Sequence, residues 1–109
     1  MRPTSIKVGP FMFKVTYQDE VKHAESKEAV DAYCDHGNHL IVIGTENYSE
    51  DFIRSSLWHE LKHAVCRLSV DSDHKKMTEE KFIQLTCNME LAVLRDNPEL
   101  VPYLLGDER

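Results

Sequence analysis

The stretch Glu50–Leu68 reads EDFIRSSLWHELKHAVCRL and predicts an amphipathic helix. Ser49 is expected to be its N-cap, and Glu50 and Asp51 place carboxylates in the first turn, near the positive end of the helix dipole. At about 100° per residue the helix has two distinct faces. One face holds Ile53, Leu57, Leu61, Ala64 and Leu68, and the roughly opposite face holds Phe52, Ser56, His59, His63 and Cys66. Both faces are therefore expected to be covered or to line a site.

Within this helix the residues His59-Glu60-Leu61-Lys62-His63 follow the pattern H-E-x-x-H. Histidines four residues apart lie on one helical face, where two imidazoles can hold a single zinc ion. Glu60 lies one step round the helix, so it is expected to be a general base that accepts a proton from water and not a ligand. Lys62 is expected to turn its ammonium group to solvent. The pattern predicts a zinc centre at His59 and His63.

A catalytic zinc site usually has three protein ligands, so a third ligand is expected. Glu79 and Glu80 begin a second predicted helix, in which apolar residues recur at helical spacing: Phe82, Leu85, Met89 and Val93. Glu79 lies three residues before Phe82, so it is expected to face inward and to be the ligand. Glu80, His74 in the intervening loop and Glu90 remain alternatives.

Two residues are candidate donors to a developing oxyanion. His74 can serve if it is not a ligand, and Tyr103 can serve if the C-terminal tail folds back over the metal. The alternative roles are a solvated loop histidine and an aromatic side chain that covers the core. A weaker group of possible ligands has the pattern Cys-x-His-x-x-His: Cys34, His36 and His39. The segment Asp35–Asn38 is better explained as a turn, so these histidines are expected at the surface.

Two strands are predicted before the first helix. Apolar and polar residues alternate in Phe11–Gln18, and a β-branched run in His39–Ile43 ends at Gly44. The segment Asp19–Glu28 is polar and predicts an exposed loop, whereas Ala29–Cys34 fits either a short strand or one helical turn.

The end of the chain completes the predicted fold. The second helix is expected to stop at Asp96-Asn97-Pro98, because proline disfavours helix in the residue before it. The tail Glu99–Arg109 carries enough apolar side chains to dock on the body. These elements predict an α+β fold, a short antiparallel or mixed sheet packed on the Glu50–Leu68 helix and on a second helix.

Length and charge exclude several classes of protein. The 109 residues correspond to one domain, 1–109. The 13 Lys and Arg against 19 Asp and Glu give a net charge of −6, which disfavours binding to nucleic acid. No apolar run approaches the ~20 residues needed to cross a bilayer, and no signal-type segment follows Met1, so a cytoplasmic protein without membrane contact is expected.

The three cysteines, Cys34, Cys66 and Cys87, are an odd number that cannot form a complete disulfide framework. They are expected to be reduced thiols. Cys66 and Cys87 are expected to fill the core as small apolar side chains.

Three segments together resemble the short zincin-like metallopeptidases of phage and prophage genomes, close in plan to minimal gluzincins. They are Leu57–Val65, Thr78–Phe82 and Leu94–Leu100, and with the strand Leu40–Ile43 the resemblance covers about the C-terminal two thirds of the chain. It implies that His59 and His63 bind zinc, that Glu60 is the general base, and that Glu79 or Glu80 completes the site. Lys62 departs from the stricter protease signature.

The same resemblance implies a substrate. In zincins an edge strand beside the active helix pairs with an extended peptide, and Leu40–Ile43 resembles that edge by position. The implied function is hydrolysis of peptide bonds in a peptide or protein substrate, in the host cytoplasm if the protein is phage-encoded. The alternative is a non-catalytic acidic phage protein that is stabilised by zinc and binds a host or virion partner. A metal-free structural or virion component is a third possibility.

Overall fold

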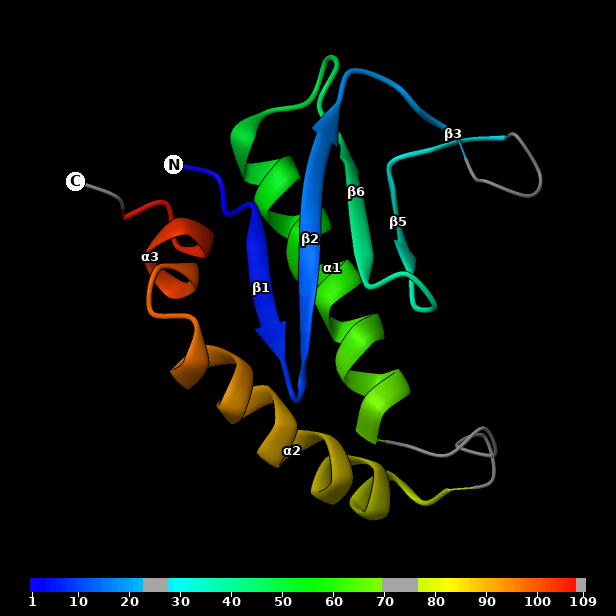
Figure 1. The fold of residues 1–109 in the computed structure, drawn as a ribbon, viewed down its shortest axis with the longest axis vertical. Coiled ribbons are helices and arrows are strands. Elements are labelled where there is room, and N and C mark those ends of the chain that lie inside the picture. The colour runs from blue at the N-terminus through cyan, green and yellow to red at the C-terminus, as the bar shows by residue number, and fades with distance from the viewer. Residues whose placement is uncertain (23–27, 70–76, 108–109) are drawn as a thin grey trace.

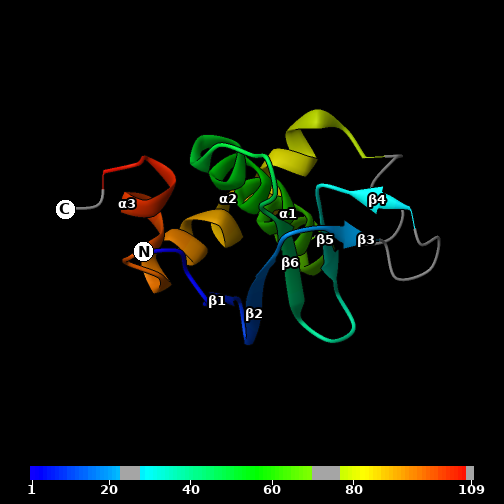
Figure 2. The same cartoon turned by 90° about the horizontal axis from the view of Figure 1, so that it is seen from above.

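The computed structural model describes residues 1–22, 28–69 and 77–107, and it has the predicted α+β architecture. Its centre is a mixed four-stranded sheet with helices on one face (Figures 1 and 2). In spatial order the strands are β1 (Ser5–Val8), β2 (Phe11–Gln18), β6 (Leu40–Gly44) and β5 (Ala32–Asp35). The β2 and β6 strands run parallel, and each outer strand is antiparallel to its neighbour.

The β2 strand has the predicted bounds, and its alternation is confirmed at its centre, where Phe13 and Val15 are buried. Phe11, at the start of the strand, is exposed. The β1 strand was not predicted. It turns only Ile6 and Val8 into the core, so its period-two pattern is too short to be recognised from sequence.

The segment before β6 contains more strand than expected. A two-stranded ribbon of β3 (Val21–Lys22) and β4 (Ala29–Val30) branches from the sheet, so the prediction that all of Asp19–Glu28 is loop is wrong. The ambiguous segment Ala29–Cys34 consists of β4 and most of β5. Val21 is buried and anchors the ribbon, which explains the pairing in so polar a segment.

A turn joins β5 to β6, as predicted. The Asn38 amide donates to Asp35 Oδ1 at 3.1 Å. β6 begins at Leu40 and not at His39, because His39 has a φ of 51° and closes the turn. Its ring stacks on Phe11, with the centroids 4.3 Å apart.

Helix α1 (Glu50–Ser69) packs against the sheet and begins as predicted. The Ser49 hydroxyl accepts a hydrogen bond from the Phe52 amide at 3.1 Å, which satisfies one free donor of the first turn. The predicted apolar face is buried from the second turn to the fourth: Ile53, Leu57, Leu61 and Ala64.

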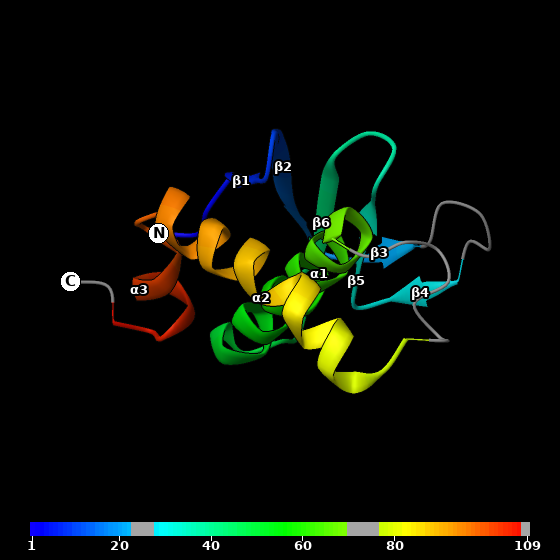
Figure 3. The same ribbon diagram turned by 90° about the horizontal axis from the view of Figure 1, so that it is seen from below.

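Helix α2 (Glu79–Asp96) crosses α1, and α3 (Leu100–Leu104) follows it (Figure 3). The predicted docking of the tail is confirmed, because Leu100 and Tyr103 are buried. Cys87 lies on the exposed side of α2, so the prediction that it fills the core is wrong. Cys34 and Cys66 are partly buried, and all three thiols are unpaired. Among the described residues, no helix is both long and apolar enough to cross a membrane.

Candidate metal centre

The two histidines of the H-E-x-x-H pattern meet on the surface of α1. Their Nε2 atoms lie 3.1 Å apart, and their rings stand edge to face with centroids 4.8 Å apart. Two nitrogen ligands of a tetrahedral zinc ion, each about 2.05 Å from the metal, are separated by about 3.3 Å. The spacing of His59 and His63 therefore fits two ligands of one ion.

The carboxylate of Glu60 lies beside this pair but is buried. Glu60 is 7% exposed, whereas the side chain of His59 is 69% exposed. Glu60 Oε2 lies 4.0 Å from His59 Nε2, and one ligand atom from each of the three residues falls within 4.8 Å of the others. Burial raises the pKa of Glu60, and the two histidines act in the opposite direction. A carboxylate whose pKa is shifted toward neutrality suits a general base.

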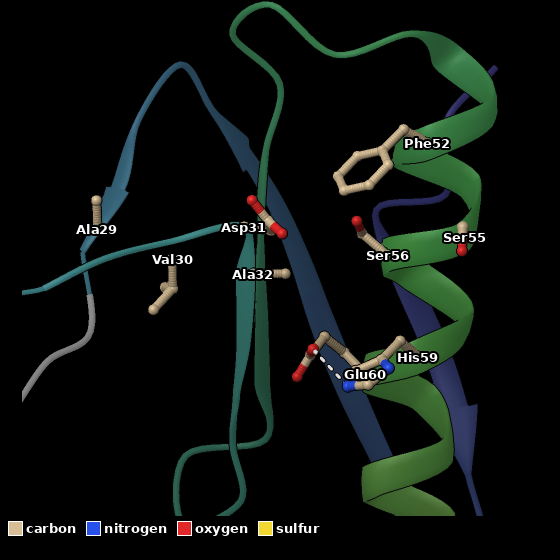
Figure 4. Close-up of a pocket in the computed structure, with 9 residues that line it drawn as sticks. All are labelled: Ala29, Val30, Asp31, Ala32, Phe52, Ser55, Ser56, His59 and Glu60. Carbon is tan, nitrogen blue, oxygen red and sulfur yellow. Dashed lines mark ion pairs between the residues drawn. The ribbon is translucent and has the colours of Figure 1, made fainter.

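Glu60 opens into a cleft of about 510 Å³ between α1 and the segment Ala29–Ala32 (Figure 4). Phe52 and Ser56 line the same cleft from α1, two turns and one turn before Glu60. The strand beside the cleft is β5, one of the two outer strands of the sheet. The expectation that Leu40–Ile43 is the edge strand is wrong, because β6 lies between β2 and β5.

Lys62 points away from the cleft. Its Nζ pairs with Glu90 Oε1 of α2 at 2.9 Å and lies 5.8 Å from the centre of the Trp58 ring. The side chain is 54% exposed, so its ammonium reaches solvent as predicted while it also joins the two helices. Glu90, one of the alternative third ligands, is held by this ion pair.

Glu79 and Glu80 lie at the first turn of α2, outside the cluster formed by the histidines and Glu60. Glu79 is seven residues before Thr86, which is buried, so it has the inward phase that the apolar stripe predicts. Both carboxylates are nevertheless exposed, because the buried residues of α2 begin only at Thr86. Glu79 is therefore exposed and does not face inward as expected, and its role as third ligand stays a prediction.

Tyr103 does not serve the metal centre in this arrangement. Its hydroxyl donates to Glu50 Oε2 at 2.6 Å, and its side chain is buried against the core. Glu50 is nine residues before His59, or about 13 Å along the helix at 1.5 Å per residue. Tyr103 therefore has its alternative role, an aromatic side chain that covers the core, and is not an oxyanion donor in this arrangement. His74, the other candidate donor, lies outside the described residues.

The weaker Cys-x-His-x-x-His group is only partly assembled. Cys34 Sγ lies 3.8 Å from His36 Nδ1, while His39 is turned away onto Phe11. Burial, with the nearby Glu60 carboxylate, raises the pKa of Cys34 to about 12. Burial also lowers the pKa of His36, to which Arg67 contributes. Because His39 is turned away, these three residues do not gather their ligand atoms, and among the described residues the cluster that could hold a metal ion is that of His59, Glu60 and His63.

Asp31 is the residue of the cleft that the sequence did not indicate. It lies between β4 and β5, in the segment whose secondary structure was ambiguous, and no motif includes it. Its place depends on a long-range contact, since its carbonyl accepts a hydrogen bond from the Gly44 amide at 2.8 Å.

Comparisons of this chain with protein-family models, with curated proteins and with solved structures find no match.

Proposed function

We propose that this protein is a zinc-dependent metallopeptidase with a zincin-like site. His59 and His63 hold the zinc ion, and Glu60 is the general base. The observation that carries the proposal is the pairing of two converging imidazole nitrogens, 3.1 Å apart, with a buried carboxylate that opens into a cleft. A solvated helix face would expose all three side chains.

Zinc and Glu60 have separate roles in the proposed reaction. Zinc, when bound, supplies a Lewis acid that polarises a carbonyl group and makes water more acidic. Glu60 accepts the proton from the attacking water and returns it to the departing amine nitrogen. The burial of Glu60 favours this exchange, because a partly desolvated carboxylate gains more from taking up a proton than a hydrated one does.

The cleft fits an extended peptide. The β5 strand is an outer strand of the sheet and runs beside α1, so a peptide can lie along it and present a backbone carbonyl next to Glu60. Pairing through backbone groups requires no particular sequence. Because the peptide is held along its backbone and not by its ends, we propose that the hydrolysis is endopeptidase activity.

Glu79 remains our proposed third ligand, with Glu80 as the alternative. Glu79 is exposed, but it lies seven residues before Thr86 and so on the same side of α2, the helix that crosses α1. A cytoplasmic setting is also part of the proposal, and the three unpaired thiols agree with a reducing compartment.

The test is cleavage of a fluorogenic peptide library by zinc-loaded protein, with Glu60→Gln as the diagnostic variant. The amide keeps the size of the carboxylate but cannot accept the proton. Cleavage should fall by about 10²-fold or more while the bound zinc is unchanged. Glu99→Gln is the matched control, since it makes the same change at an exposed position just before α3.

Cleavage that survives Glu60→Gln at the wild-type rate would contradict the proposal. So would a complete absence of cleavage by the zinc-loaded wild-type protein. If chelation of zinc then unfolded the protein, the alternative of a zinc-stabilised acidic binding protein would take its place.

A further inference from the structure

The cleft beside Glu60 continues away from the metal centre. A neighbouring cavity of about 280 Å³ shares three lining residues with it, Ala29, Val30 and Asp31. Figure 4 shows Asp31 and Phe52 facing one another at one end of the cleft, with Glu60 and His59 at the other end. A ligand that lies along the cleft therefore meets both sets of side chains.

The far end of the cleft is negatively charged. Four carboxylates line the smaller cavity: Asp19, Glu20, Asp31 and Glu46. Within the described part of the chain, neither cavity is lined by a lysine or an arginine. Carboxylates gathered in a concave surface produce a negative potential that attracts cations.

Two aromatic rings stand near Asp31, Tyr48 in the smaller cavity and Phe52 in the cleft. Tyr48 and Phe52 have ring centroids 4.6 Å apart, and they are 38% and 41% exposed. The Tyr48 hydroxyl donates to Asp31 Oδ1, which fixes the tyrosine against the carboxylate. Exposed aromatic faces next to carboxylates bind the charged end and the apolar stem of a long basic side chain together.

The opposite end of the same helix differs in charge. His36 and Arg67 line a separate cavity of about 220 Å³ near the C-terminal end of α1. The two ends of α1 therefore offer different partners to a peptide, and a basic side chain is favoured at only one of them.

We propose that Asp31, Glu46, Tyr48 and Phe52 form a cation pocket that binds a lysine or arginine side chain of the peptide substrate. This inference rests on the proposed peptidase function and names its substrate class. Eight residues separate Phe52 from Glu60, which is about 12 Å along a helix. An extended peptide covers that length in roughly three to four residues, so the basic side chain lies within about that distance of the cleaved bond.

The experiment compares matched peptides cleaved by the zinc-loaded protein. Lysine, norleucine and glutamate are placed in turn at each of the positions on both sides of one cleaved bond. At one position the lysine peptide should be cleaved with a kcat/KM about tenfold higher than that of the norleucine peptide. A ratio of this size corresponds to the free energy of one charge-assisted hydrogen bond. Norleucine keeps the stem of lysine without the charge, so the ratio isolates the cation.

Variants then test whether the cation pocket causes the preference for lysine over norleucine. Asp31→Asn combined with Glu46→Gln should lower the ratio of lysine to norleucine to below about threefold. The amide oxygen introduced by Asp31→Asn can still accept the hydrogen bond from Tyr48, so the geometry of the pocket is kept. Glu99→Gln removes one negative charge far from the cleft and should leave the ratio unchanged. A ratio that is unaffected by the double variant would overturn the cation pocket.

A binding measurement separates failure of the pocket from failure of the peptidase. Lysine and norleucine peptides are titrated, by fluorescence anisotropy, into the zinc-loaded Glu60→Gln variant. Cleavage of all peptides without a charge preference overturns the cation pocket and leaves the peptidase standing. Selective binding of the lysine peptide without any cleavage by wild type supports the pocket and overturns the peptidase. Neither binding nor cleavage overturns both.

Discussion

Glu60 differs from the histidines on either side of it because of its phase on α1. It lies three residues after Leu57 and four before Ala64, both of which are fully buried. A carboxylate on this buried stripe costs free energy through desolvation, and the neighbouring His59 and His63 offset only part of that cost. An acid whose pKa is raised by burial in a cleft is a marker of functional sites.

Asn97 joins the C-terminal end of α2 to β1 through side-chain hydrogen bonds. Its Oδ1 accepts from the Lys7 amide at 2.8 Å, and its Nδ2 donates to the carbonyls of Lys7 and Val93 at 2.8 and 2.7 Å. The side chain is buried. Because β1 is an outer strand, Asn97 satisfies backbone groups that a further strand would otherwise pair.

Asn97→Ala should therefore lower the free energy of unfolding by about 2 kcal/mol, since it removes both hydrogen-bond partners from the partly buried backbone amide and carbonyl of Lys7. Urea unfolding followed by circular dichroism measures the difference. Asn88→Ala is the control, because Asn88 lies on the exposed side of the same helix and should change stability by less than about 0.5 kcal/mol. Equal effects of the two variants would show that the Asn97 contacts contribute nothing.

At the scale of elements, a cluster of polar side chains joins the N-terminal segment, α1 and α3. Glu50 Oε1 pairs with Arg2 at 2.9 Å, and Glu50 Oε2 accepts from the Tyr103 hydroxyl at 2.6 Å. Arg54 adds a hydrogen bond to the Tyr103 carbonyl at 2.8 Å. The hydrogen bonds from Arg2 and Tyr103 lower the pKa of Glu50 to about 2.

This shift makes stability depend on pH. The folded pKa lies below the ordinary value of 4.5, so ionised Glu50 stabilises the fold above that pH, and the contribution disappears as the pH falls toward 2. The Glu50 side chain is 37% exposed, so solvent screening reduces the contribution to about 1 kcal/mol. Glu50→Gln should therefore destabilise the protein by that amount at pH 7 and have almost no effect near pH 2. Urea unfolding at both pH values checks this, and a penalty that does not change with pH would refute it.

The sequence predicted the long elements better than the short ones. The periodicities of α1, α2 and β2 extend over enough residues to specify their type and nearly their ends. β1 and the β3–β4 ribbon have two to four residues per strand, and their pairing depends on partners elsewhere in the chain. Cys87 was misplaced for a related reason. Only a narrow stripe of α2 is buried, and helical spacing does not reveal how much of the helix the rest of the protein covers.

At the scale of the whole molecule, the arrangement of the sheet decides where the candidate site lies. The parallel pairing of β2 with β6 places β6 inside the sheet and leaves β5 as the outer strand next to α1. The cleft forms between β5, the end of β4 and α1. The sequence indicated His59, Glu60 and His63 because they lie on one helix, where spacing alone brings them together. Asp31 and Phe52 come together only through the tertiary fold, which no local pattern encodes.

The most direct test of the account is the amount of zinc that the folded protein binds. Protein freed of metal by a chelator is reconstituted with zinc, dialysed and analysed by inductively coupled plasma mass spectrometry. The proposed zinc site predicts about one zinc ion per chain, falling to less than about a tenth in the double variant His59→Ala, His63→Ala. His39→Asn is the control, since it removes an imidazole outside the cluster and asparagine tolerates its positive φ. Wild-type protein that retains no zinc, or a double variant that retains as much as wild type, would contradict the account.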